Sequence, residues 1–173
     1  ETVEENKRGH AVEMRHCTKT FGKVLANCEV CLDVRWGEIL ALLGENGSGK
    51  TTLMNMLSGI YYPDYGEIFV NGEHVSIRSP RDAYNLHIGM IHQHFKLVDV
   101  LTAAENIILG LPGGMTVDRN KLAGEIRDIS HRYGFEIAPN KKIYDMSVSE
   151  KQTVEIVKML YRGANILILD EPT

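Results

Sequence analysis

Alternating apolar and polar positions near the start of the chain predict antiparallel strands. Residues 11–34 contain two such stretches, on either side of a turn at Gly22. Residues 66–76 predict a hairpin, because the dipeptide Asn71-Gly72 suits a two-residue turn that requires positive φ. The first part of the chain is therefore expected to hold an antiparallel sheet.

Short apolar runs predict buried strands elsewhere in the chain. Ile39–Leu43 and Ile166–Leu169 have the length of buried strands, and the second strand is expected to cover Asn165–Leu169. A Gly-rich loop and a helix from about Lys50 to Ser58 follow the first run, and Ile88–Gln93 reads as a further strand. This alternation of strands and helices is typical of an α/β core.

The middle of the chain has the periodicity of helices. Thr102 with Glu105, and Ser147 with Glu150, have the spacing of capping boxes at helix N-termini. A further helix that ends at Gly134 is predicted between them. Its apolar positions, at helical spacing, are Leu122, Ile126, Ile129 and Tyr133.

The order of these elements predicts the fold class and the domain organisation. An antiparallel beginning, an α/β core, a helical insertion and a return to the core together indicate a single α/β domain over residues 1–173. We expect its core at about 11–98 and 163–173, with a helical subdomain at about 99–162.

Composition narrows the class of protein. Of the 173 residues, 43% are hydrophobic and 24% charged, which is the profile of a globular domain. No apolar run approaches the ~20 residues of a membrane-spanning helix, and the charged residues 1–10 predict no signal peptide. The net charge of −4 provides no overall positive field that would attract nucleic acid.

Some residues that suggest chemistry have simpler interpretations. The Cys28 and Cys31 spacing resembles half a zinc site, but no second cysteine pair completes it, so we expect a reduced, cytoplasmic protein. His92 and His94 share a strand face without an evident third metal ligand. The tyrosines of a predicted turn, which we interpret as surface and core filler, are Tyr61, Tyr62 and Tyr65.

The segment Gly44–Thr51 carries the clearest chemistry. It fits the pattern GxxxxGK[ST] and lies between a predicted strand and a predicted helix, the context in which this pattern binds phosphate. Glycines let backbone N–H groups approach phosphate oxygens, and the helix N-terminus favours the same anion. Lys50 is expected to reach the β- and γ-phosphates, and Thr51 to offer its hydroxyl to Mg²⁺.

A second candidate lies at the end of the last apolar run. Asp170 and Glu171 follow that strand directly, where Asp170 would lie near a hydrated Mg²⁺. Glu171 would orient or deprotonate a water molecule. We expect the strand to lie beside the strand that precedes the Gly-rich loop, which would bring the acids to the phosphates.

Four segments in this order resemble the ATP-binding cassette of ABC transporters. They are Gly44–Thr52 (GENGSGKTT), Gln93 after a strand, Met146–Gln152 (MSVSEKQ) and Leu169–Thr173 (LDEPT). The resemblance implies a P-loop NTPase of the ABC type, with an antiparallel β subdomain and a helical insertion, truncated after the Walker B strand. It also implies ATP and Mg²⁺ as cofactors.

The resemblance further implies individual roles. Phe21 would stack on adenine, Gln93 would touch Mg²⁺ and the attacking water, and Glu171 would be the general base. Asp170 and Thr51 would complete the Mg²⁺ contacts. The implied ATP contacts of the loop are Gly44, Asn46, Gly47, Ser48, Gly49, Lys50, Thr51 and Thr52. The implied signature, which would reach ATP held by an opposite cassette, is Ser147, Val148, Ser149 and Glu150.

Within the family, the segments 91–106 and 161–164 resemble importers of simple sugars and nucleosides, in which two cassettes share one polypeptide. The implied partners are a second cassette, transmembrane permease subunits and, indirectly, an extracytoplasmic substrate-binding protein, at the cytoplasmic face of the membrane. A soluble non-transport ABC ATPase and an ATP-binding module without turnover stay open as alternatives.

Two features depart from the family pattern. Ser149 replaces a glycine of the signature, and Thr153 replaces an arginine. The sequence also stops at Thr173, before the family's Asp-containing loop, a further core strand and the switch histidine. We therefore expect this chain by itself to bind nucleotide weakly and to hydrolyse no ATP.

Overall fold

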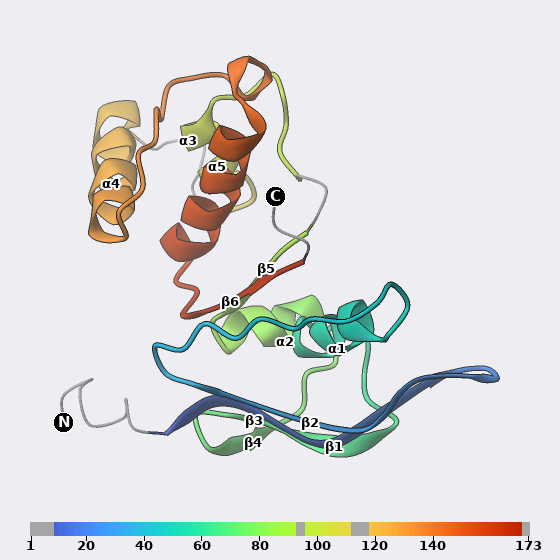
Figure 1. Ribbon diagram of the computed structural model, residues 1–173. Helices are drawn as coiled ribbons and strands as arrows, with labels where there is room; N and C mark the ends of the chain where they lie inside the picture. The colour runs from blue at the N-terminus through green and yellow to red at the C-terminus, as the bar shows by residue number, and fades with distance from the viewer. Residues whose placement is uncertain (1–8, 93–95, 112–117, 171–173) are drawn as a thin grey trace. The chain divides into compact units, whose positions relative to one another are not determined.

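The computed structural model describes residues 9–92, 96–111 and 118–170 (Figure 1). The chain divides into two compact units, Glu1–Ile88 and Gly89–Thr173. None of the helices in the described residues is both long and apolar enough to cross a membrane.

The first unit is built on the antiparallel sheet that the sequence predicts. Its strands are β1 (His10–Phe21), β2 (Val24–Arg35), β3 (Tyr65–Val70) and β4 (Glu73–Val75), in the order β2-β1-β3-β4. The turn between β3 and β4 has φ of 55° at Asn71 and 80° at Gly72, which confirms the predicted two-residue hairpin.

Two helices lie on the same face of this sheet (Figure 1). They are α1 (Lys50–Leu57), which begins and ends within a residue of its predicted bounds, and α2 (Pro80–Asn85). The sheet buries side chains of β1 and β3, and α1 buries its apolar face. The buried residues of these elements include Val12, Met14, Cys17, Leu53, Met56, Leu57, Ile68 and Val70.

The prediction of a strand at Ile39–Leu43 is wrong. These residues have no regular secondary structure, and the side chains of Ile39 and Leu43 are 97% and 93% exposed. An apolar run favours burial, but a strand also needs neighbours that satisfy its backbone N–H and C=O groups. The four strands of the first unit pair with one another and leave this run unpaired in their sheet.

The second unit contains the remaining elements, apart from the first residue of β5, which closes the first unit. The strands β5 (Ile88–Ile91) and β6 (Ile166–Leu169) form a two-stranded sheet. The helices are α3 (Ala103–Ile108), α4 (Arg119–Arg132) and α5 (Val148–Tyr161), with a 3₁₀ turn η2 (Ile143–Asp145) before α5. Of the β6 side chains only Ile168 is buried, so this strand is more exposed than the apolar run predicts.

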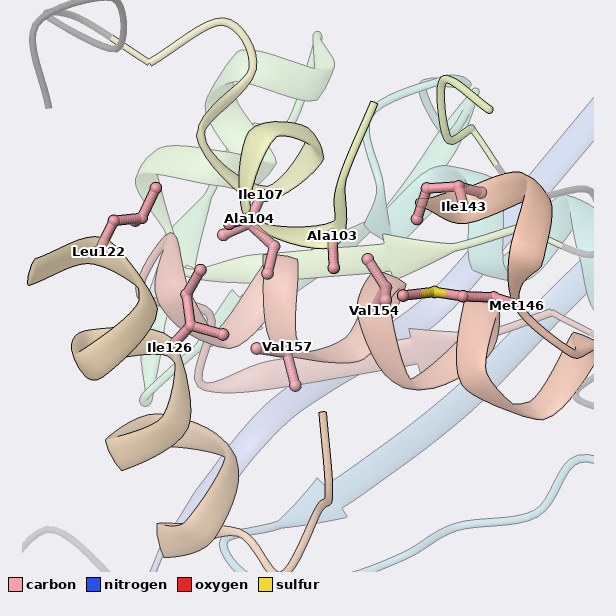
Figure 2. Packing of buried hydrophobic residues seen from close by; sticks show 9 residues of the cluster. All are labelled: Ala103, Ala104, Ile107, Leu122, Ile126, Ile143, Met146, Val154 and Val157. Carbon is pink, nitrogen blue, oxygen red and sulfur yellow. The ribbon is translucent and has the colours of Figure 1, made fainter. Parts of the chain in front are cut away.

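A hydrophobic cluster holds the helices of the second unit together (Figure 2). Its residues come from α3, α4, α5 and the segment around η2, and several are 0% exposed. They are Ala103, Ala104, Ile107, Leu122, Ile126, Ile143, Met146, Val154 and Val157. Tyr133, the last position of the apolar face predicted for α4, is the C-cap residue after Arg132 and is 54% exposed.

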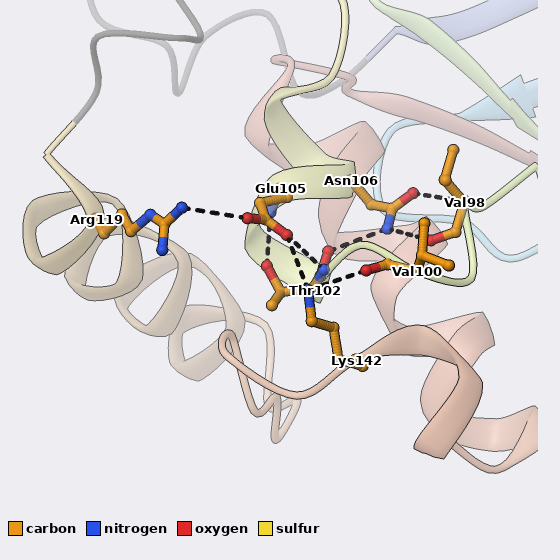
Figure 3. Close-up of polar contacts among 7 residues, drawn as sticks. All are labelled: Val98, Val100, Thr102, Glu105, Asn106, Arg119 and Lys142. Carbon is orange, nitrogen blue, oxygen red and sulfur yellow. Dashed lines mark hydrogen bonds and ion pairs between the residues drawn. The ribbon is translucent and has the colours of Figure 1, made fainter.

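The predicted capping boxes are both present. Thr102 Oγ1 accepts a hydrogen bond from the Glu105 N–H at 3.2 Å, and Glu105 accepts one from the Thr102 N–H at 2.8 Å. Figure 3 shows Lys142 and Arg119 beside the Glu105 carboxylate, at 3.7 and 3.6 Å. The side chain of the fully buried Asn106 accepts a hydrogen bond from the Val98 N–H and donates one to the Val98 carbonyl. These bonds fix the segment that precedes α3.

We expect Val157→Ala to lower the free energy of unfolding by about 2 kcal/mol, because two buried methyl groups are removed and a cavity is left. Val148 lies on the same helix but is 55% exposed, so Val148→Ala is the matched control and should cost under about 0.5 kcal/mol. Urea unfolding measures both. Equal losses would mean that the cluster does not carry the stability of this unit.

Candidate functional site

The Gly-rich loop that begins at Gly44 leads directly into α1. Gly47 and Gly49 have φ of 82° and 89°, a region that L-residues with a side chain rarely adopt. Gly49 is the N-cap of α1 and offers no side-chain cap, so the first N–H groups of the helix point out of its N-terminus. The loop therefore presents backbone donors and the positive end of a helix at one place.

The Lys50 ammonium lies across this loop. It donates hydrogen bonds to the Gly44 carbonyl at 2.7 Å, the Glu45 carbonyl at 2.8 Å and Ser48 Oγ at 3.3 Å. The positive charge is thus held beside the backbone donors rather than extended into water. This arrangement can attract and bind a polyphosphate.

Of the glycines at the two ends of the loop, Gly49 also has a packing reason. A Cβ on Gly44 would lie 2.8 Å from Ser48 Oγ, a contact that rotation of the serine side chain can relieve. A Cβ on Gly49 would lie 2.4 Å from the Ala26 carbonyl oxygen and 2.8 Å from Asn27 Nδ2. The sequence suggested glycine for the approach of phosphate, and the structure adds that Gly49 must approach β2.

Asn27 is a site residue that sequence reasoning did not find. Its Nδ2 donates a hydrogen bond to the Gly49 carbonyl at 3.2 Å, and the residue is 7% exposed. Its Oδ1 is buried and has no hydrogen-bond partner among the described residues. The pairing of β2 with β1 is irregular on both sides of Asn27, so the alternation of apolar and polar residues gave no signal that Asn27 is buried.

Phe21 lies at the end of β1, before the turn at Gly22. The residue is 41% exposed, so it is not buried in the core and has surface that a ligand could contact. Its neighbours are the Tyr61 ring, at a centroid distance of 4.9 Å, and Lys19 Nζ, at 5.6 Å. This position is compatible with the role that the resemblance implies for Phe21.

The predicted signature forms the N-terminus of α5. Ser147 Oγ accepts a hydrogen bond from the Glu150 N–H at 3.3 Å, and Glu150 accepts one from the Ser147 N–H at 2.8 Å. The Lys141 ammonium, 2.6 Å from Glu150 Oε1, is the main cause that lowers the pKa of the Glu150 carboxyl to about 2. Val148 and Ser149 stay exposed at this helix end.

The candidate metal and catalytic residues are described only in part. Asp170 lies at the end of β6, and its N–H donates to the Ile91 carbonyl at 3.0 Å. Gln93 and Glu171 lie outside the described residues. Burial lowers the pKa of His92, as does the charge of Lys96, while Asp170 and Glu155 oppose the shift. The loop residues belong to the first unit and Asp170 to the second.

The residues that suggested alternative metal sites are described only in part. It contains no group of three or more His, Cys, Asp or Glu residues that could hold an ion. Cys17 is buried, whereas Cys28 and Cys31 are exposed. His94 lies outside the described residues.

Comparison with known proteins identifies relatives over most of the chain. A model of the ABC transporter family matches residues 28–173. The guanosine import ATP-binding protein NupO of Bacillus subtilis (strain 168) is 54% identical over 95% of this chain. The nucleoside import ATP-binding protein NupA of Lactococcus lactis subsp. cremoris (strain MG1363) is 52% identical over 94%. The chain spans 32% of the length of each relative, about a third.

Solved structures support the fold independently of close sequence similarity. A nucleotide-free ATP-binding cassette from an ABC transporter aligns with a TM-score of 0.80 at 22% identity, over 95% of this chain and 70% of that one. CbiO1 from Clostridium perfringens aligns with a TM-score of 0.78 at 24% identity, over 95% and 66%. The predicted α/β fold class, with an antiparallel sheet and helices, is thereby confirmed.

We expect Gly49→Ala to destabilise the first unit by about 2–4 kcal/mol, since a methyl group would meet the Ala26 carbonyl in addition to the cost of positive φ. Gly47→Ala is the matched control, because Gly47 also has positive φ but nothing lies within 4 Å of the place that its methyl group would take. It should cost about 1–2 kcal/mol. Chemical denaturation of the two variants separates the contact from the conformational cost; equal losses would contradict the contact with β2.

Proposed function

Because this chain belongs to the ABC transporter family, we propose that the protein binds ATP with Mg²⁺ and hydrolyses it to drive import. One observation carries this proposal. The Lys50 ammonium lies within 2.8 Å of two carbonyls of a Gly-rich loop at the N-terminus of α1. That combination suits the β- and γ-phosphates of a nucleoside triphosphate.

The chemistry that we propose distributes the work among a few residues. Lys50 and the loop amides bind and orient the phosphates. Glu171 accepts a proton from a water molecule whose oxygen attacks the γ-phosphorus, and the bond from that phosphorus to the β–γ bridging oxygen breaks. Gln93 holds the water in line.

The residues that we propose to hold Mg²⁺ carry oxygen donors. Thr51 is the second residue of α1, directly after Lys50, and Asp170 follows β6. With Gln93 they would supply a hydroxyl, a carboxylate and an amide oxygen, the hard ligands that Mg²⁺ prefers. When bound, the ion would neutralise charge on the phosphate oxygens.

The proposed cargo is a nucleoside, with simple sugars as the second class. Two relatives named for guanosine and nucleoside import are 54% and 52% identical. The ribose import ATP-binding protein RbsA of Yersinia pestis is 43% identical over 94% of this chain. The higher identities belong to the nucleoside importers, which favours that class.

The proposed partners follow from the same membership. Ser147–Glu150 would face the nucleotide of a second cassette, either a separate copy or a second half of the same polypeptide. Permease subunits would span the membrane, a substrate-binding protein would deliver the cargo, and this protein would lie at the cytoplasmic face. No role with nucleic acid is proposed, since the net charge is −4.

A second candidate function is an ATP-binding module that does not turn over. Ser149 stands where the family has a glycine, and its carbonyl accepts a hydrogen bond from Thr153 Oγ1 at 3.1 Å. A side chain there leaves less room for backbone to approach a phosphate. Hydrolysis measured in the full-length protein separates this function from the first.

We expect Lys50→Ala to weaken MgATP binding about 10- to 100-fold, because a charge-assisted contact to phosphate is lost. Isothermal calorimetry on the full-length protein measures the change. Lys121→Ala removes a lysine from the exposed face of α4 and should leave affinity within about twofold. Unchanged binding in Lys50→Ala would refute the assignment of this loop.

We expect Glu171→Gln to preserve ATP binding and to slow hydrolysis about 100-fold or more, because glutamine keeps the shape but cannot accept the proton. A coupled assay for ADP release in the full-length protein, reconstituted with its permease, provides the rate. Turnover within about twofold of the unmodified protein would assign the proton to another group.

A further inference from the structure

Phe21 is part of an aromatic pair that joins two distant segments of the first unit. The ring of Tyr61 lies 4.9 Å from the ring of Phe21, centroid to centroid, at an interplanar angle of 68°. This edge-type arrangement is favourable for aromatic rings. Phe21 ends β1, whereas Tyr61 lies after α1, the helix that begins with Lys50.

The backbone of Tyr61 is fixed to the end of α1. The N–H groups of Ile60 and Tyr61 both donate to the Asn55 carbonyl, at 2.9 and 3.1 Å. These hydrogen bonds fix the backbone from which the Tyr61 side chain extends. The contact of its ring with Phe21 therefore links α1 to the end of β1.

Asp64, which follows Tyr61 in the chain, also connects this segment to the end of β1. It accepts hydrogen bonds from Lys19 Nζ at 2.8 Å and from the N–H and hydroxyl of Thr20, both at 2.7 Å. The Asp64 N–H donates in turn to the Thr18 carbonyl at 2.8 Å. The residues just before Phe21 are thus held against the segment that carries Tyr61.

The strand register places this pair at a useful distance from the loop. Lys19 pairs with Asn27, and Asn27 donates to the Gly49 carbonyl. Phe21 lies two residues beyond Lys19, about 7 Å along the strand. A base stacked on Phe21 would be separated from the loop by a distance that the sugar and first phosphate of a nucleotide can span.

We propose that Tyr61 is a positioning residue for the base of the nucleotide: it holds the Phe21 ring in the orientation that stacks on the base. This inference rests on the proposed function, because it presumes that the loop binds the phosphates. Tyr61 then contributes to the affinity for nucleotides and not to the affinity for a polyphosphate without a base. The neighbouring Tyr62 contacts Arg78 instead, at 4.8 Å, and has no part in this pair.

The experiment compares the binding of ATP with that of inorganic tripolyphosphate in the full-length protein, at the site whose affinity Lys50→Ala is expected to weaken. Tyr61→Ala should weaken ATP binding about 3- to 10-fold, the scale of an aromatic pair, and leave tripolyphosphate binding within about twofold. Tyr61→Phe keeps the ring and should restore ATP affinity. Tyr62→Ala, the matched control, should bind both ligands as the unmodified protein does.

A double substitution makes the test stricter. In a Phe21→Ala background, Tyr61→Ala should cause no further loss of ATP affinity, because there is no ring left to position. Equal losses for ATP and tripolyphosphate, additive losses in the double variant, or unchanged ATP binding in Tyr61→Ala would each overturn the proposal. If the unmodified protein binds neither ligand at this site, the proposed function itself fails, and the inference fails with it.

Discussion

The close approach of Gly49 to the backbone of β2 is the constraint on which the candidate site depends. There is no space for a methyl group between Gly49 and the Ala26 carbonyl, and Asn27 bonds the Gly49 carbonyl from the same strand. A loop of this kind would otherwise be free to adopt many conformations. Its contact with a strand of a four-stranded sheet gives the N-terminus of α1, and with it Lys50, a fixed place.

The second unit uses capping for a comparable purpose. Ser147 and Glu150 close the N-terminus of α5, and Lys141 offsets the charge of Glu150 at 2.6 Å. A carboxylate at this position would repel a phosphate, so the paired lysine matters for any anion that approaches the helix end. The residues that stabilise the helix thereby also set the electrostatics of the proposed signature.

Much of the fold could be predicted from local sequence, because the decisive signals are local. The Asn71-Gly72 turn and both capping boxes depend on residues within four positions of each other. Ile39–Leu43 could not be judged this way, since strand formation requires backbone partners from elsewhere. The apolar composition of the run favours burial of its side chains, but it does not show whether another strand is available to pair with it.

The candidate site also combines a local pattern, which the sequence reveals, with distant contacts, which it does not. The pattern from Gly44 to Thr51 identifies the loop, but Asn27 and Tyr61 are 22 and 40 residues from their contacts at Gly49 and Phe21. Tyr61 lies near other tyrosines in a predicted turn, where the sequence favours a packing role over a functional one. Only the fold distinguishes it from Tyr62, whose ring contacts Arg78.

In the proposed assignment, the phosphates and the base would be recognised by different interactions within one unit. The loop offers backbone donors and one ammonium, which recognise charge and are indifferent to the base. The exposed face of Phe21 offers stacking, which every base can satisfy because every base has a π-face. In this assignment, neither feature would contact the hydrogen-bonding edge that differs between adenine and guanine. This part of the proposed site would therefore distinguish nucleotides from bare polyphosphates more strongly than it would distinguish one purine nucleotide from another.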